Sequence, residues 1–129
     1  MNTPICDFAA RYAESGSLRM HMPGHKGASF LGCEAMDITE IPGADSLYEA
    51  SGIIAESEKR TSEIFGTEMT LYSAEGSSQC IRAMLALIRL YAQKTQRNGY
   101  ILAARNVHKT FVTAAGLLDL DVRFIEPKE

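Results

Sequence analysis

The chain has 129 residues, 46% of them hydrophobic, which is enough to bury one modest core and too little for two independent domains. Its 13 basic and 16 acidic residues leave a net charge of −3 without a run of Lys or Arg, so neither nucleic acid nor an anionic membrane is an expected partner. Three cysteines without metal-type spacing, no signal-peptide pattern and no apolar segment long enough to span a bilayer favour a cytoplasmic protein.

Two helices are expected in the first part of the chain, residues 1–66. The first should run from Pro4 to about Ser15, because proline suits a first helical position and apolar residues follow at helical spacing. The second should cover residues 52–65, with Gly66 at the position of a C-terminal cap.

The segment between these helices combines a turn with side chains that often carry function. Two histidines and a lysine flank a Pro-Gly pair, which breaks the helical spacing that a metal-binding histidine pair would need, so no metal site is expected. Binding groups tend to lie on loops, and an irregular segment of about thirty residues is long for a compact domain. We therefore predict a substrate or interface loop, with a solvated turn as the alternative; its candidate residues are His21, Pro23, Gly24, His25 and Lys26.

The second part of the chain, residues 67–129, alternates apolar runs typical of strands with helical periodicity. A strand is expected just before Gly76, followed by a helix from Ser78 to about Gln96. Further elements follow in the order strand 100–104, helix 111–118 and strand 122–125. The order strand-helix-strand-helix-strand predicts a parallel α/β sheet with binding sites at the carboxyl ends of its strands.

Gly76-Ser77-Ser78 is the candidate site at the first of these strand ends. A helix that starts there would offer free backbone N–H groups and two hydroxyls at the positive end of its dipole, a setting that suits a phosphate group. The alternative is that Ser77 or Ser78 only caps the helix. His108 lies at the next strand end, which favours the phosphate site, and the chain has neither a Walker-type nor a dinucleotide-binding glycine loop.

Four motifs together resemble the ornithine/lysine/arginine decarboxylase family, whose members are pyridoxal-phosphate enzymes with an aspartate aminotransferase-like fold. They occur in the family's order and spacing over nearly the whole chain: Met22-Pro23-Gly24-His25-Lys26-Gly27, the segment 37–47, Gly76-Ser77-Ser78 and Arg105-Asn106-Val107-His108-Lys109-Thr110. The resemblance implies the N-terminal portion of a large domain of the pyridoxal-phosphate transferase type. Residues 1–66 would form its N-terminal helix, the Pro-Gly-His-Lys loop and a second helix, and residues 67–129 the start of its cofactor-binding α/β domain.

The resemblance also implies roles for individual residues. Gly76, Ser77, Ser78 and Gln79 would bind the phosphate of pyridoxal phosphate, and the His108 ring would stack on its pyridine ring. Glu75 departs from a good phosphate environment, because its carboxylate would repel the phosphate unless it points away. By motif order the Schiff-base lysine of the family and the acid that pairs with the pyridine nitrogen are missing, so no catalytic residue is expected in this chain.

The resulting expectation is a fragment of a pyridoxal-phosphate-dependent decarboxylase of ornithine, lysine or arginine that is inactive by itself. Its sheet would be incomplete, so its expected partners are a second copy or the remainder of the decarboxylase, and the parent enzyme would take a basic amino acid as substrate. Two alternatives remain open at this point. One is a non-catalytic module that pairs with a full-length decarboxylase, and the other is a small α/β domain that binds a phosphate ligand.

Overall fold

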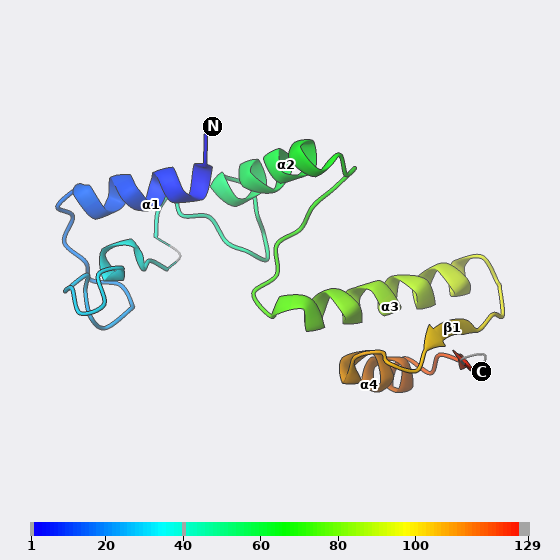
Figure 1. The fold of residues 1–129 in the computed structure, drawn as a ribbon. Coiled ribbons are helices and arrows are strands. Elements are labelled where there is room, and N and C mark those ends of the chain that lie inside the picture. Colours follow the sequence, from blue (N-terminus) through cyan, green and yellow to red (C-terminus); the bar gives the residue numbers. More distant parts are fainter. Residues whose placement is uncertain (1, 40, 127–129) are drawn as a thin grey trace. The chain divides into compact units, whose positions relative to one another are not determined.

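The computed structural model describes residues 2–39 and 41–126 of the chain (Figure 1). The chain divides into two compact units, Met1–Tyr72 and Ser73–Glu129, and each is described by itself below. The first unit contains the helices α1 (Pro4–Glu14) and α2 (Ile53–Phe65) and the short 3-10 helix η1 (Glu34–Met36). The second contains α3 (Gly76–Lys94), β1 (Ile101–Ala104), α4 (Lys109–Leu117) and β2 (Val122–Ile125).

Both expected helices of the first unit form, and local signals explain their ends. Pro4 occupies the first turn of α1, and the Asp7 carboxylate accepts hydrogen bonds from the backbone N–H and hydroxyl of Thr3, at 2.9 and 2.8 Å. These bonds lower the pKa of Asp7, because they stabilise its charged form. Helix α2 ends at Gly66, whose φ of 65° is the left-handed conformation that glycine adopts most easily.

Helix α1 packs against both α2 and η1 in the first unit. The Phe8 ring of α1 lies so close to Gly43 that a Cβ added at Gly43 would be 3.0 Å from it, and Gly43 has a φ of 89°. Ala44, the next residue, is buried. The segment before α2 therefore needs a glycine both for its backbone angle and for its close contact with α1.

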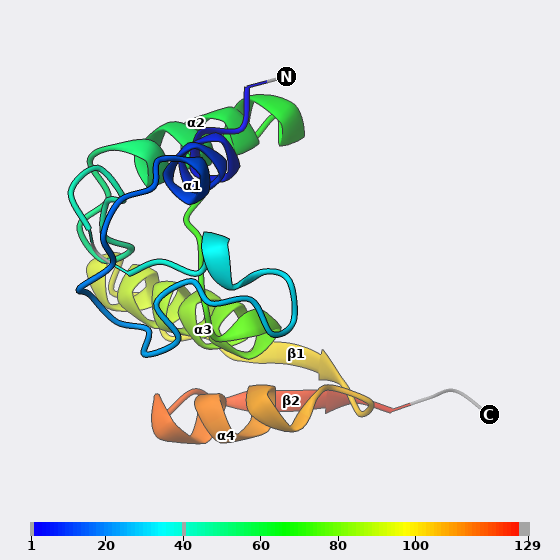
Figure 2. The same ribbon diagram turned by 90° about the vertical axis from the view of Figure 1, so that its left-hand side faces the viewer.

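The second unit has the parallel α/β arrangement that its sequence predicts for residues 100–125. Strands β1 and β2 run in the same direction in Figure 2, with Ile101 paired to Val122 and Ala104 paired to Ile125. The core joins both helices to β1 around the fully buried Leu85 of α3; its other buried members are Ala103, Phe111, Ala114 and Ala115. The observed part of the fold class is thus a small α/β unit with a parallel sheet of two strands.

The strand expected just before Gly76 does not form, which corrects the predicted five-element order. The Tyr72 backbone N–H donates to the Glu58 carboxylate at 2.7 Å, and its hydroxyl lies 2.8 Å from the Ser57 hydroxyl and 2.7 Å from that of Thr61. Thr70 also bonds to Ser62 of α2 at 3.0 Å, and residues 70–72 belong to the first unit. A strand requires the backbone of a neighbouring strand, and the only sheet in the described residues consists of β1 and β2.

Much apolar surface is uncovered in the second unit. Leu87 of α3 is 66% exposed, Leu102 of β1 61% and Ile125 of β2 56%. A two-stranded sheet with one helix pair cannot cover both of its faces, so the unit has the character of an incomplete α/β domain.

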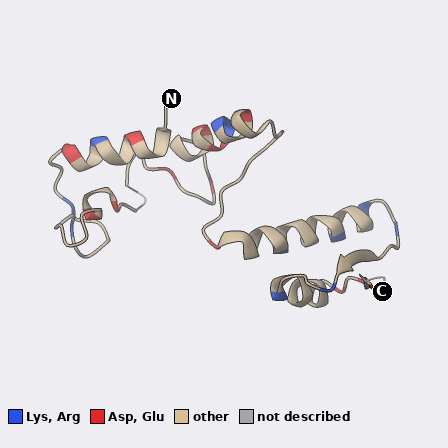
Figure 3. Cartoon of the chain, viewed as in Figure 1, with Lys and Arg blue, Asp and Glu red and all other residues tan. Residues whose placement is uncertain are grey.

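Charged residues are scattered over helices and loops rather than gathered in one patch of a single sign (Figure 3). Lys94 stands in the last turn of α3, where the helix dipole favours a positive charge. Of the helices in the described residues, none combines the length and the apolar character needed to cross a membrane.

Candidate functional site

The first turn of α3 carries the residues predicted to bind a phosphate. Gly76 is the first residue of the helix and has a φ of 65°, and Ser77, Ser78 and Gln79 follow it within the helix. The first N–H groups of an α-helix have no partner within the helix, so they are available to a ligand. The alternative that Ser77 or Ser78 caps the helix is wrong, because the capping position belongs to Glu75 and no side chain caps it.

His108 stands at the start of the next helix and caps it with its ring. It is the N-cap residue of α4, and its Nδ1 atom accepts a hydrogen bond from the Thr110 backbone N–H at 3.2 Å. Serine, threonine, aspartate and asparagine are the usual residues at this position, so a capping imidazole is uncommon. The bond fixes the ring of His108 to the first turn of α4.

Thr110 joins the two predicted parts of the site. Its Oγ1 atom lies 3.0 Å from Nδ1 of His108 and 3.2 Å from Oγ of Ser78. The structure therefore brings Ser78 and His108 together through one side chain, although thirty residues separate them in the sequence. The sequence indicates Thr110 only as the last residue of the motif that contains His108, and Thr110 was not predicted as a site residue.

The Glu75 carboxylate, next to the predicted phosphate-binding residues, forms an ion pair with an arginine. Its Oε2 atom accepts a hydrogen bond from Nη1 of Arg82 at 3.2 Å, and both side chains are more than half exposed. An exposed ion pair of this kind contributes little stability. It does hold the carboxylate against the side of α3 two turns along, which reduces the repulsion of an anion at the helix start.

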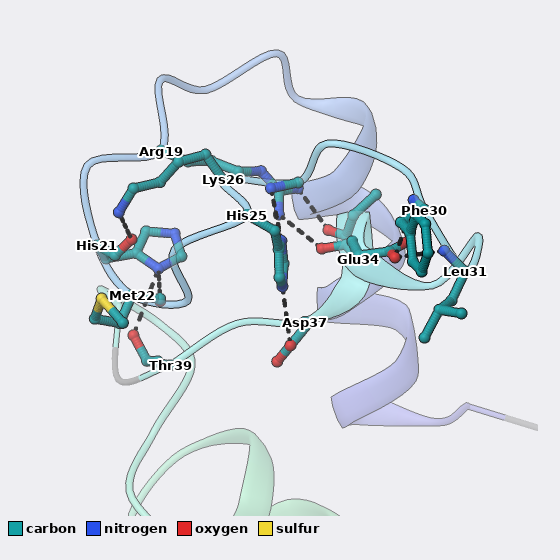
Figure 4. Close-up of polar contacts among 12 residues, drawn as sticks. Arg19, His21, Met22, His25, Lys26, Phe30, Leu31, Glu34, Asp37 and Thr39 are labelled. Atoms are coloured by element: carbon teal, nitrogen blue, oxygen red, sulfur yellow. Dashed lines mark hydrogen bonds and ion pairs between the residues drawn. The ribbon is translucent and has the colours of Figure 1, made fainter.

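The histidines of the first unit are each held in a defined network rather than in a solvated turn (Figure 4). The Gly27 backbone N–H donates to Nδ1 of His25 at 3.0 Å, so the neutral ring carries its hydrogen on Nε2, which lies 3.1 Å from the Asp37 carboxylate. His21 hydrogen-bonds through Nε2 to the Tyr12 hydroxyl at 2.9 Å. Lys26 donates from Nζ to the His21 carbonyl oxygen at 2.5 Å.

Pro23 and Gly24 form the turn between these histidines. The Met22–Pro23 peptide bond is cis, and the Lys26 backbone N–H donates to the Pro23 carbonyl at 3.3 Å. Gly24 has no atom within 4 Å of the position that a Cβ would take, so it leaves open space at the tip of the turn. The predicted loop residues are thus close together, and no observation assigns them a substrate or a partner.

Arg19 and Glu34 hold the base of this loop. The Arg19 guanidinium donates to the carbonyl oxygens of Glu34 and Ala35, at 3.4 and 2.5 Å, and lies 4.8 Å from the centre of the Tyr12 ring. The Glu34 carboxylate accepts the backbone N–H groups that follow the turn, those of Phe30, Leu31 and Gly32. These bonds, led by that from Leu31, lower the pKa of Glu34 to about 2.

Asp45 has a structural role that the sequence did not reveal. Its carboxylate accepts hydrogen bonds from the backbone N–H groups of Ser51, Gly52 and Ile54, at 3.1, 2.8 and 2.9 Å. It thus satisfies donors at the start of α2, where the helix dipole favours a negative charge. These bonds, led by that from Ser51, hold the pKa of Asp45 well below its usual range.

Other features of the described residues do not coincide with the predicted sites. A groove of about 490 Å³ in the first unit lies between the start of α1 and the later turns of α2 and includes Ile5, Ser57, Thr61 and Tyr72, but no predicted site residue. Residues 2–39 and 41–126 contain no group of three His, Cys, Asp or Glu side chains that could hold a metal ion. The three cysteines are free and exposed.

Comparison with known proteins gives relatives over nearly the whole chain. The chain is 31% identical to an arginine decarboxylase of Halalkalibacterium halodurans and 30% identical to an arginine decarboxylase of Bacillus subtilis. Each of these alignments covers 98% of this chain and 26% of the relative. An uncharacterized protein of Bacillus subtilis, YaaO, is 26% identical over 98% of this chain and 27% of its own length. The chain thus spans about a quarter of the length of the curated relatives that it matches.

No solved structure matches the fold. A family model described as the major domain of Orn/Lys/Arg decarboxylases matches residues 3–129. Because that match covers almost the entire sequence, the expected resemblance is confirmed, and the chain belongs to the Orn/Lys/Arg decarboxylase family.

Proposed function

We propose that this chain forms the phosphate-binding and ring-stacking part of a pyridoxal-phosphate-dependent decarboxylase that acts on a basic amino acid. The observation that carries the proposal is the link from Ser78 through Thr110 to His108, which unites the first turns of α3 and α4. A phosphate group and an aromatic ring of one cofactor need such neighbouring binding groups. The relatives named arginine decarboxylase make arginine the first substrate to test.

The donor set at the start of α3 fits a phosphate. The Ser77 and Ser78 hydroxyls and the free N–H groups of the first turn are all donors, and the ion pair with Arg82 engages the Glu75 carboxylate. Gly76 leaves open space, since a Cβ there would meet no atom within 4 Å. In the proposal Gly76, Ser77, Ser78 and Gln79 hold the cofactor phosphate.

His108 fits the proposed role of a stacking residue. Its Nδ1 atom is bonded to Thr110, so the ring is oriented, and the residue is exposed. A ring stacked on a pyridine ring orients it and excludes water from one side. Pyridoxal phosphate, when bound, supplies the electron sink that the loss of a carboxylate from an amino acid requires.

Catalysis requires groups beyond this set. None of the lysines lies at the family's Schiff-base position by motif order, so we propose that this chain binds the cofactor weakly and does not decarboxylate by itself. The remaining three quarters of a relative's length would provide those groups, either on the same chain or as a partner. The loop with His21, Pro23, Gly24, His25 and Lys26 is proposed to face substrate or a neighbouring subunit of such a cytoplasmic enzyme.

Protection from unfolding tests this proposal. Pyridoxal phosphate should raise the unfolding temperature in a concentration-dependent way, and pyridoxal without the phosphate should do so much less. Ser77→Ala should weaken the protection, whereas Ser29→Ala, a change in an exposed loop of the first unit, should leave it unaltered.

Two results would contradict the proposal. Equal protection by pyridoxal phosphate and by ATP would indicate a general phosphate-ligand domain. Loss of all protection in the Ser29→Ala control would show that the ligand binds elsewhere.

A further inference from the structure

We propose that Thr110 is a positioning residue that holds the His108 ring and the Ser78 hydroxyl in one hydrogen-bonded chain. The inference deepens the proposed cofactor site and rests on it for its functional meaning. Its structural content depends only on three contacts within the second unit. These are the 3.2 and 3.0 Å contacts of Thr110 with Nδ1 of His108 and its 3.2 Å contact with Ser78.

Thr110 sets the tautomer of His108. Its backbone N–H donates to Nδ1, so that nitrogen must present a lone pair, and the neutral ring then carries its hydrogen on Nε2. The Thr110 hydroxyl lies close enough to donate to the same atom. Two donors from one residue therefore fix both the tautomer and the direction of the ring.

The single hydroxyl proton of Thr110 can serve either neighbour. When it is given to His108, the Thr110 oxygen accepts the proton of Ser78, and the chain runs from Ser78 through Thr110 to the ring. When the Ser78 hydroxyl donates its hydrogen bond to a phosphate instead, the Thr110 hydroxyl can turn and donate to the Ser78 oxygen. The Thr110 backbone N–H still holds Nδ1 in that state, so the ring keeps its orientation whether or not a phosphate is bound.

Nitrogen-15 NMR of histidine side chains tests this directly in the full chain. The chain has three histidines, so His21 and His25 of the first unit provide internal controls. The informative variant is Thr110→Val, which keeps the shape and removes the hydroxyl, and Thr110→Ser should restore it. The matched control is Thr113→Val on the same helix, because the Thr113 hydroxyl bonds only to backbone carbonyls of Lys109 and Thr110.

The expected result is a change confined to His108. In the wild type, in Thr110→Ser and in Thr113→Val, His108 should be the Nε2–H tautomer with a hydrogen-bonded Nδ1 signal. In Thr110→Val the Nδ1 signal should move toward that of a free nitrogen, while the signals of His21 and His25 stay in place. The affinity for pyridoxal phosphate should fall about fivefold in Thr110→Val, the effect of losing one neutral hydrogen bond.

The other outcomes separate the role of Thr110 from the proposed function. Thr110→Val keeps the backbone N–H that bonds to Nδ1, so an unchanged His108 signal in this variant would overturn the role of the Thr110 hydroxyl, even if pyridoxal phosphate binds. A shifted signal without any binding of pyridoxal phosphate by the wild type would support the role of Thr110 and reject the proposed function. If Thr110→Val does not fold, Thr110→Ala removes the same hydroxyl with a residue that favours helix, and the same two signals decide.

Discussion

The Ser78 hydroxyl lies 3.2 Å from the Thr110 hydroxyl, and this contact connects the first turn of α3 with the first turn of α4. The two helix starts therefore lie next to each other, and the N–H group of Thr110 at the start of α4 is bonded to the ring of His108. Two residues before Thr110, the ring of His108 lies with its Nδ1 atom 3.0 Å from the Thr110 hydroxyl. The three side chains form a polar cluster in a unit whose buried core is apolar, around Leu85.

Replacing the two serines separately should show that Ser78, and not Ser77, contributes to the stability of the fold. Ser78→Ala removes a partly buried hydrogen bond and should lower the free energy of unfolding by about 1 kcal/mol. Ser77→Ala changes an exposed residue and should leave that free energy within about 0.5 kcal/mol of the wild type. Urea denaturation measures both, and equal losses in the two variants would contradict the contact between Ser78 and Thr110.

Leu85 should be the most sensitive core position of the second unit. It is fully buried among residues of α4 and β1, so Leu85→Ala should cost about 2–5 kcal/mol in the free energy of unfolding. Leu87, on the same helix and 66% exposed, provides the control, and Leu87→Ala should cost less than about 1 kcal/mol. Thermal unfolding followed by circular dichroism compares the two. Similar losses would mean that α3 presents a different face to the core.

Several elements were predictable because their signals are local. Gly66 ends α2 with a left-handed conformation that favours glycine, and the apolar residues of β2 need only a parallel neighbour one crossover away. The strand expected before Gly76 was not predictable in the same way, because a strand forms only where the backbone of another strand bonds to it. Tyr72 instead bonds to α2.

The candidate site shows the same division between local and distant signals. His108 and Gly76-Ser77-Ser78 were identified from motifs and expected at strand ends; the structure places them at the starts of α4 and α3, with no strand before Gly76. Thr110 and Asp45 were missed as site and capping residues, because their roles come from partners that are remote in the sequence. Ser78 lies 32 residues from Thr110, and Asp45 bonds to N–H groups up to nine residues away.

The stability of the first unit should depend on pH through Glu34. Its pKa is lowered from 4.5 to about 2 in the folded chain, so the charged form is favoured by folding. This contribution is fully present above about pH 5 and is lost as the pH falls through the folded pKa near 2. The free energy of unfolding should therefore decrease from pH 5 to pH 2, and Glu34→Gln should flatten that decrease. Urea titrations of the wild type and the variant across this range measure the difference.

The control for this prediction is Glu14→Gln, at an exposed position at the end of α1. It should leave the slope between pH 5 and pH 2 as it is in the wild type. A wild-type slope in Glu34→Gln would show that the N–H groups of Phe30, Leu31 and Gly32 do not stabilise the charged carboxylate. Asp45 acts in the same direction, so a smaller slope should remain in Glu34→Gln.

The uncovered apolar surface of α3 should make the chain associate with itself. Leu87 and Leu90 are 66% and 60% exposed on one helix, and contiguous apolar surface of this kind is rare on monomeric proteins. The average mass in sedimentation velocity should rise with protein concentration, and Leu87→Lys should shift it toward the monomer, because a charge would be buried in any contact there. Val112→Lys, at an exposed position of α4, is the matched control, and an equal effect of both changes would mean that general charge repulsion rather than the α3 surface governs association. A mass that stays monomeric at all concentrations would contradict the prediction outright.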